Sequence, residues 1–375
     1  MQLNIKKILF SVLLGLIVMG LGVAALQNKK DGSQTEAYSS QPASNPFAAA
    51  PPSDNPADFQ VYSLSGPTMG TSYNIKLVLP AYRANEIKSF ALGVKAVLAK
   101  VETQMSTYQS TSELSQFNDS FKGEWVVVSK PLYKVISAAQ SLSSRSQGAF
   151  DITVGPLVNL WGFGPSHHLD QVPSAFALKE AFDRVGYNKL LLDAEKSALK
   201  KEADLYLDLS AIAKGYGVDK VLEFLVSKGL ENVLVEVGGE IRAIGLKPNG
   251  STWRIAIESP LSNTRAIQKV INIRDMALAT SGDYRNYFEK AGRRYSHTIN
   301  PRTGKPIAHK LASVTVLHEN CMMADGLATM FMVMGPEPAL QFANKNNLAI
   351  FMLVKSEGGF TEFSSRAFSQ LFDDK

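Results

Sequence analysis

Residues Val233 to Gly245 read VLVEVGGEIRAIG, two runs of mostly apolar and β-branched residues on either side of Gly238-Gly239. This pattern predicts two strands joined by a tight glycine turn. Strands with so short a connection pair antiparallel, because parallel neighbours need a crossover of about a dozen residues or more. The segment therefore favours mixed or antiparallel sheets over a strict doubly wound parallel sheet.

Further strand and helix patterns alternate irregularly around this segment. Short apolar or alternating runs predict strands at Thr71–Leu79, Trp125–Val128, Leu205–Leu209, Trp253–Glu258 and Ala266–Ile273. Apolar residues at helical spacing predict helices over Ala84–Met105, Pro131–Ser144, the residues between Leu209 and Gly229, and Met322–Met334. This order predicts the α+β class, with helices packed on mixed or antiparallel sheets.

Composition excludes several classes of protein. Of 375 residues, 45% are hydrophobic and 19% are charged, which excludes a disordered chain, a coiled coil and a multi-span transporter. The net charge of +5 is small and spread out, so we expect no nucleic-acid partner. Cys321 is the single cysteine, which excludes an intrachain disulfide and any multi-cysteine metal site.

The N-terminal region differs from the rest of the chain. Ile8–Leu26 carries no charge and follows Lys6 and Lys7; as a helix it would extend about 28 Å, enough to cross a bilayer. A signal anchor and a cleavable signal peptide both fit this pattern. The next residues are rich in Ser, Ala, Pro and Asn, as in a tether. We therefore expect a signal peptide or anchor at 1–26, a flexible linker at 27–58 and a globular domain at 59–375.

Three glycine-rich segments contain candidate ligand-binding residues. The loop GPTMGT, Gly66–Thr71, either cradles a phosphate or a flat ring or is a simple turn. Asp151, in the apolar segment GAFDITVGP, is either a ligand-binding carboxylate or a helix cap. In LDLSAIAKGYG, Asp208 and Lys214 lie where a strand leads into a helix, a place where anions bind; a structural ion pair is the alternative.

Two later segments contain candidate catalytic groups. His297 precedes the turn-rich NPRTGKP, and histidine suits general base catalysis near neutral pH, although a structural histidine fits as well. Asp325 and Thr329 are four residues apart, so on a helix they share one face. A carboxylate and a hydroxyl are hard oxygen ligands that suit Mg²⁺. The alternative is the polar face of a helix in a methionine-rich core.

These segments occur in the order GPTMGT, MSTY, GAFD, LDLSAIAKGYG, VEVGGEI, SGDYRNYF, YSHTINPRTG and ADGLAT. Together they resemble the ApbE family of FAD:protein FMN transferases, from about Gly66 to Gly335. The resemblance implies an ApbE-like flavin transferase domain that requires Mg²⁺ and splits FAD at its pyrophosphate. It implies transfer of FMN to a threonine hydroxyl of a partner protein and release of AMP.

The resemblance also implies partners and a location. Family acceptors are subunits of membrane electron-transfer complexes, of the sodium-pumping NADH:quinone reductase or Rnf type, with a motif that ends in Ala-Thr. The N-terminal segment matches the family's export signal, so we expect the enzyme on the periplasmic side of the bacterial inner membrane, anchored or exported. Two other functions stay open: an FAD pyrophosphatase that uses water as acceptor, and a flavin-binding protein without catalysis.

The resemblance assigns roles to individual residues. The residues expected to contact FAD are Met69, Tyr108, Ala149, Phe150, Asp151, Asp208, Lys214 and Ile299. The expected Mg²⁺ ligands are the side chains of Asp325 and Thr329 and the backbone carbonyls of Ala211 and Ala328. His297 would be the base. Asn300 and Gly326 depart from the family pattern, and neither change removes a group that the chemistry needs.

Overall fold

The computed structural model describes residues 58–164, 172–260, 266–283, 287–290 and 292–372. The expected membrane segment and nearly all of the expected linker lie outside these ranges. None of the helices within them combines the length and apolar character that a bilayer span requires.

An eight-stranded sheet forms the centre of the described part of the chain, and all its neighbours pair antiparallel. Its strands, in spatial order, are β1 (Phe59–Thr68), β2 (Thr71–Pro80), β6 (Val233–Val237), β7 (Glu240–Ile244), β10 (Met276–Gly282), β15 (Leu311–His318), β16 (Ala349–Ser356) and β17 (Gly359–Ser364). The hairpin predicted at Gly238-Gly239 is confirmed as β6–β7, where Val237 pairs with Glu240. Both turn glycines have positive φ, which explains why glycine is needed there.

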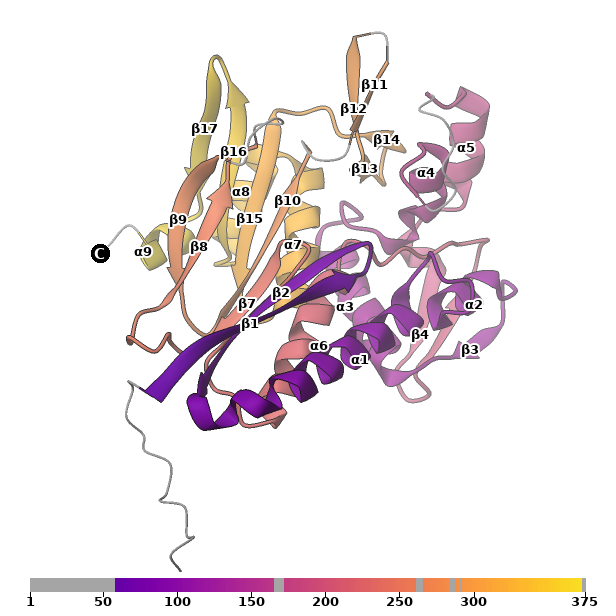
Figure 1. Cartoon of the computed structure of the whole chain (residues 1–375). Coiled ribbons are helices and arrows are strands. Elements are labelled where there is room, and N and C mark those ends of the chain that lie inside the picture. The colour runs from indigo at the N-terminus through magenta and orange to yellow at the C-terminus, as the bar shows by residue number, and fades with distance from the viewer. Residues whose placement is uncertain (1–57, 165–171, 261–265, 284–286, 291, 373–375) are drawn as a thin grey trace, which may run out of the picture. The chain divides into compact units, whose positions relative to one another are not determined.

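Helices cover one face of this sheet, and a two-stranded ribbon covers the other (Figure 1). The helical layer contains α1 (Ile87–Met105), α6 (Ala213–Ser227), α7 (Cys321–Met334) and α8 (Pro336–Lys345). The opposite layer contains β8 (Trp253–Glu258), β9 (Ile267–Ile273) and α9 (Arg366–Phe372). The sheet thus has an apolar core on both faces, and the α+β class is confirmed.

Smaller elements lie beside the helical layer. A second antiparallel sheet has the order β3 (Trp125–Val127), β5 (Ala198–Lys201) and β4 (Leu190–Asp193). The remaining helices are α2 (Glu113–Asp119), α3 (Lys130–Arg145), α4 (Gly155–Leu160) and α5 (Ala175–Asp183), with short 3₁₀ helices at Ala81–Glu86, Ile152–Val154 and Tyr187–Lys189. Two hairpins are formed by β11 (Tyr287–Lys290) with β12 (Arg293–Ser296), and by β13 (Ile299–Asn300) with β14 (Lys305–Pro306).

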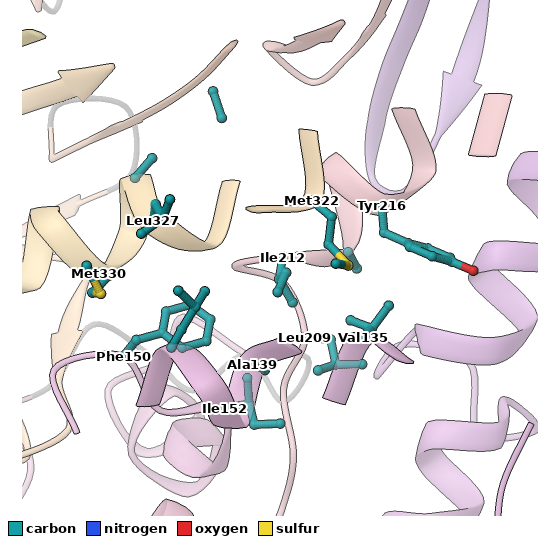
Figure 2. Packing of buried hydrophobic residues seen from close by; sticks show 14 of the residues in the cluster. Val135, Ala139, Phe150, Ile152, Leu209, Ile212, Tyr216, Met322, Leu327 and Met330 are labelled. Carbon is teal, nitrogen blue, oxygen red and sulfur yellow. The ribbon is translucent and has the colours of Figure 1, made fainter. Parts of the chain in front are cut away.

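Helix α7 is buried on most of its surface because it packs against β10 and β15, α3, α6 and α8. Figure 2 shows side chains of α7, α3 and the segment before α6 gathered in one apolar cluster, with Phe150 beside them. A helix in this position must be apolar nearly all round. A carboxylate on it is therefore held in a fixed, mostly dry environment.

The strand predicted at Leu205–Leu209 is wrong. Its alternate leucines are buried as expected, but the segment joins no sheet. The side chain of Asn118 takes the place of a neighbouring strand: the Leu207 N–H donates to Asn118 Oδ1 at 2.8 Å, and Asn118 Nδ2 donates to the Leu207 carbonyl at 2.9 Å. Alternation predicts an extended chain with one buried face, but it does not identify the partner of the backbone groups.

Candidate active site

A cavity of about 420 Å³ opens between the helical layer and the loops around His297. Its wall is built from the 3₁₀ helix at Ile152–Val154, the turn before α6, the ends of β7 and β10, and α7. All residues expected in the site line this cavity, except Met69 and Ala328. Segments that are far apart in the sequence therefore meet at one place.

The turn into α6 is held by Asp208. Its Oδ1 accepts hydrogen bonds from the Ser210 backbone N–H at 2.8 Å and from Ser210 Oγ at 2.5 Å. Lys214 lies in the first turn of the helix, and its Nζ donates to the Ser210 carbonyl at 3.1 Å. The turn thus points both a carboxylate and an ammonium group toward the cavity wall.

Helices α6 and α7 approach closely at Gly215. Its N–H donates to Asp325 Oδ2 at 2.9 Å, and a Cβ at this position would lie 2.2 Å from the Cys321 carbonyl oxygen. Glycine is therefore required by the close approach of the two helices. The contact fixes Asp325, which is 3% exposed, at the edge of the cavity.

Three ionisable groups meet beside this contact. Lys214 Nζ lies 3.8 Å from Asp325 Oδ1 and 3.7 Å from Glu240 Oε1. Glu240, at the start of β7, is 5% exposed, and its Oε2 has no hydrogen-bond partner among the described residues. The cluster therefore contains two buried carboxyl groups and one ammonium group.

Burial controls the ionisation of this cluster. It raises the pKa of Asp325, and it raises the pKa of Glu240 to about 8, because a carboxylate is poorly solvated there. Burial alone would lower the pKa of Lys214, but attraction by Asp325 and Glu240 outweighs it and the pKa lies above its ordinary value. Lys214 is therefore a permanent cation at neutral pH.

Thr329 lies one helical turn after Asp325 and also faces the cavity. Its hydroxyl is 3.2 Å from Ser281 Oγ on β10. Ala211 lines the cavity, whereas Ala328 is fully buried in the core of α7. The expected pairing of Asp325 and Thr329 on one face is confirmed, and their role toward a metal stays a prediction.

The donor set fits a divalent cation of the Mg²⁺ type. Within the described ranges, no three histidine, cysteine, aspartate or glutamate side chains are placed to share a metal ion. A cation here would rely on Asp325, Thr329 and oxygens of water or phosphate, which is the mixed oxygen environment that Mg²⁺ prefers. Glu240 Oε2, which has no hydrogen-bond partner among the described residues, also leaves an oxygen acceptor available beside this position.

His297 lies between β12 and β13 and faces the same cavity. Its ring meets the edge of Phe163 at 6.3 Å between centroids. Phe163 stacks on Phe288, which stacks on Tyr295, which stacks on Trp161, with centroids 5.0–5.7 Å apart. This aromatic stack restricts where His297 can lie. The sequence signal for it is the pair of aromatic-rich runs LWGF and NYF near the two motifs.

Asp151 is a helix cap, one of the two possibilities left by its sequence. Its Oδ1 accepts from the Thr153 N–H at 2.8 Å and from Thr153 Oγ1 at 2.7 Å, and its Oδ2 accepts from the Tyr187 N–H at 2.8 Å. Burial raises its pKa. The carboxylate lines the cavity while holding the backbone of the wall, and its contact with FAD stays a prediction.

The other expected flavin contacts differ in position. Met69 and Gly70 form the turn between β1 and β2, so the loop GPTMGT is a hairpin turn. Met69 has a φ of 49°, and its N–H donates a hydrogen bond to Glu102 Oε1 at 2.7 Å. Tyr108 is 66% exposed at the edge of the cavity. The remaining members of the set are buried in the wall: Ala149, Phe150 and Ile299.

Sequence reasoning missed Glu240. It lies inside the motif VEVGGEI, in the second of the two predicted strands. A charged residue directly after a Gly-Gly turn, at the start of an apolar strand, could have been noticed as costly to bury. The structure shows that it shares Lys214 with Asp325.

Comparison with known proteins supports a common family. A family model described as the ApbE family matches residues 69–352. A Vibrio cholerae protein named FAD:protein FMN transferase is 48% identical over 316 residues, which are 84% of this chain and 93% of that protein. A Haemophilus influenzae protein of the same name is 44% identical over 321 residues, with the same coverage.

Solved structures give the same result. The flavin transferase ApbE from Vibrio cholerae matches with a TM-score of 0.78 and 45% identity, over 84% of this chain and 100% of that one. The Pseudomonas stutzeri flavinyl transferase ApbE, in its apo form, matches with a TM-score of 0.77 and 42% identity, over 84% and 97%.

Proposed function

Because the chain belongs to the ApbE family, we propose that it is an FAD:protein FMN transferase. The proposed reaction moves the FMN half of FAD to a threonine hydroxyl of an acceptor protein and releases AMP. The observation that carries this proposal is the meeting of His297, Lys214, Asp325 and Thr329 around one cavity. A base and a cation site on one wall are what a transfer from a diphosphate to a hydroxyl needs.

We assign His297 the role of general base. A threonine hydroxyl is a weak nucleophile, so its proton must leave as the oxygen attacks phosphorus. The packing of Phe163 against His297 limits the positions of the imidazole, which favours a defined approach of the acceptor hydroxyl. The bond that breaks joins the attacked phosphorus to the oxygen of the AMP half.

We assign the cation site to Asp325 and Thr329, with the Ala211 and Ala328 carbonyls as further proposed ligands. Mg²⁺ bound there would stabilise the negative charge of the diphosphate. Asp325 is suited to this role because the Gly215 N–H orients one of its oxygens and leaves the other facing Lys214 and the cavity.

The proposed acceptor and location rest on the family and the N-terminal sequence. We propose an acceptor with an Ala-Thr flavinylation motif, in a subunit of a complex of the sodium-pumping NADH:quinone reductase or Rnf type. The uncharged segment Ile8–Leu26 after two lysines supports a catalytic domain on the periplasmic side of the inner membrane.

The experiment that tests the function is covalent labelling. The protein is incubated with FAD, Mg²⁺ and an acceptor fragment that carries the Ala-Thr motif, and the fragment is analysed by mass spectrometry. We expect an added FMN on the threonine and one AMP released for each label. The matched control fragment has valine in place of that threonine and should stay unlabelled.

The His297→Ala variant separates binding from catalysis. It should still bind FAD, because the cavity wall is otherwise unchanged, but label the acceptor at least about 100-fold more slowly. Labelling at the normal rate would exclude His297 as the base.

The labelling experiment with the wild-type protein also tests the two alternative functions. Free FMN and AMP without a labelled fragment would indicate a pyrophosphatase. Bound FAD without release of AMP would indicate a flavin-binding protein.

A further inference from the structure

Lys214 lies between two buried carboxyl groups without hydrogen-bonding distance to either. Its Nζ is 3.8 Å from Asp325 Oδ1 and 3.7 Å from Glu240 Oε1, while the hydrogen bond that anchors it goes to the Ser210 carbonyl at 3.1 Å. At these distances the ammonium acts mainly through its charge. Its four-carbon stem allows it to move between the two partners.

The two carboxyl groups are not equivalent. Asp325 Oδ2 is held by the Gly215 N–H, so its Oδ1 is the oxygen that faces Lys214. Glu240 has one oxygen near Lys214 and a second, Oε2, with no hydrogen-bond partner among the described residues. The Glu240 side chain is 6% exposed and lines the cavity, so Oε2 is a buried acceptor with spare capacity.

A divalent cation at Asp325 would meet this ammonium. Two positive groups within about 4 Å of the same carboxylate oxygen repel each other strongly in a mostly buried site. Lys214 must then move away from Asp325, and Glu240 is the carboxyl group within reach of that movement. The spare Oε2 gives the displaced ammonium a second acceptor.

We propose that Lys214 is an internal counter-cation, which neutralises Asp325 when the divalent site is empty, and that Glu240 receives Lys214 when a divalent cation binds. Lys214 and Glu240 would thereby set the affinity for the divalent cation. Lys214 competes with the cation for Asp325, and Glu240 reduces this competition by binding the displaced ammonium group. This inference rests on the proposed function for the location of the cation site, and it makes Glu240 a positioning residue.

The test measures binding of Mn²⁺ alone to the full chain without FAD, from the loss of the free-ion signal in electron paramagnetic resonance. Lys214→Met removes the competing charge at similar length and should bind Mn²⁺ about 10-fold more tightly than the wild type. Glu240→Gln removes the carboxyl group that receives the ammonium and should bind about 10-fold more weakly. Lys214→Arg keeps the charge and should stay within about threefold of the wild type.

The double variant tests whether Glu240 acts through Lys214. With Lys214→Met already present, Glu240→Gln should change Mn²⁺ affinity by less than about threefold. A full 10-fold loss in that background would make Glu240 a direct ligand and overturn the proposed exchange. The control is Lys220→Met with Glu223→Gln, an ion pair on the same helix outside the cavity wall, which should leave Mn²⁺ binding unchanged.

Two further outcomes would contradict the proposal. Unchanged or weaker Mn²⁺ binding by Lys214→Met, in a protein whose circular dichroism shows that it is folded, excludes a counter-cation role. If Lys214→Met fails to fold, Lys214→Gln is measured in its place. Weaker FAD binding with unchanged Mn²⁺ binding would make Lys214 a flavin contact instead. Labelling of the acceptor is measured separately, so normal labelling with unchanged Mn²⁺ affinities contradicts this inference and not the proposed function.

Discussion

Asp325 shows how one carboxylate serves both the fold and the site. Its Oδ2 accepts the Gly215 N–H, which joins α7 to α6, and its Oδ1 faces the charged side of the cavity. Replacing it with asparagine keeps an oxygen for the N–H and removes the charge. We expect Asp325→Asn to fold, to need at least about 10-fold more Mg²⁺ for half-maximal labelling, and to lose the stabilisation by Mg²⁺ in thermal melts.

The Asp325→Ala variant is the matched comparison, because it loses the hydrogen bond as well as the charge. It should melt at a lower temperature than Asp325→Asn in the presence of EDTA. Full labelling by Asp325→Ala at limiting Mg²⁺ would contradict the assignment of the cation site.

Two other residues give the stability a predicted pH dependence. Burial lowers the pKa of His309 and of His318 below their usual value of about 6.5; near His309, Asp283 opposes this shift and Lys355 adds to it. The unfolded chain therefore binds more protons than the folded chain as the pH falls. The contribution of the two neutral histidines to the free energy of unfolding is complete above about pH 7, and it is lost as the pH falls through their lowered pKa values.

The raised pKa of Glu240 acts in the opposite direction, and it does so in the wild type and in the histidine variants alike. We therefore expect the melting temperature of His309→Gln, relative to that of the wild type, to rise between pH 7.5 and pH 5.5. His309 Nε2 is buried and has no hydrogen-bond partner among the described residues, so charging it in the folded state is costly. The variant with both histidines replaced should show a larger relative rise than either single variant. A profile identical to the wild type in the double variant would exclude these groups as the cause.

At the scale of elements, the contact between α6 and α7 holds Asp325 in place at the cavity. A Cβ at Gly215 would meet a backbone carbonyl at 2.2 Å, so Gly215→Ala must separate the helices. We expect a loss of about 2–3 kcal/mol in the free energy of unfolding, measured by urea denaturation, together with weaker Mg²⁺ dependence. The displaced helix would move Asp325 relative to Lys214.

Gly326→Ala is the matched control on α7. There a Cβ would meet Leu142 Cδ1 at 2.5 Å, the end of a flexible side chain that can turn aside. Alanine also gains about 1 kcal/mol of helix propensity over glycine. We expect this variant to stay within about 1 kcal/mol of the wild type, and an equal loss in both variants would contradict the argument from backbone contact.

The sequence patterns predicted elements whose signal is local. The hairpin at Gly238-Gly239 and the helix that ends at Gly335 were predictable because periodicity and glycine turns act over a few residues. Asn118 bonded to Leu207, and Glu240 beside Lys214, were not predictable, because these partners are brought together by the fold. The motifs predicted most of the residues around the cavity, but they did not predict the proposed movement of Lys214 between Asp325 and Glu240.

At the scale of the whole molecule, the chain divides at Pro52: Ser53–Lys375 forms a compact unit with its own apolar cores. The family match, 69–352, lies inside this unit, whereas the proposed membrane segment lies outside the described residues. We therefore predict that binding of FAD and flavin transfer require only the compact unit, and that the location at the membrane requires the N-terminal residues.

We therefore expect a chain that lacks residues 1–52 to keep the melting temperature of the full chain and its rate of labelling of a soluble acceptor fragment. The full chain should sediment with membranes through its uncharged 19-residue segment if that segment is an anchor, and the shortened chain should not. Intact-mass measurement of the exported protein distinguishes a signal anchor from a cleavable signal peptide, because cleavage leaves a shorter mature chain in the soluble fraction. A shortened chain that is folded but fails to label would contradict the division of roles, since none of the described residues that line the cavity precedes Tyr108.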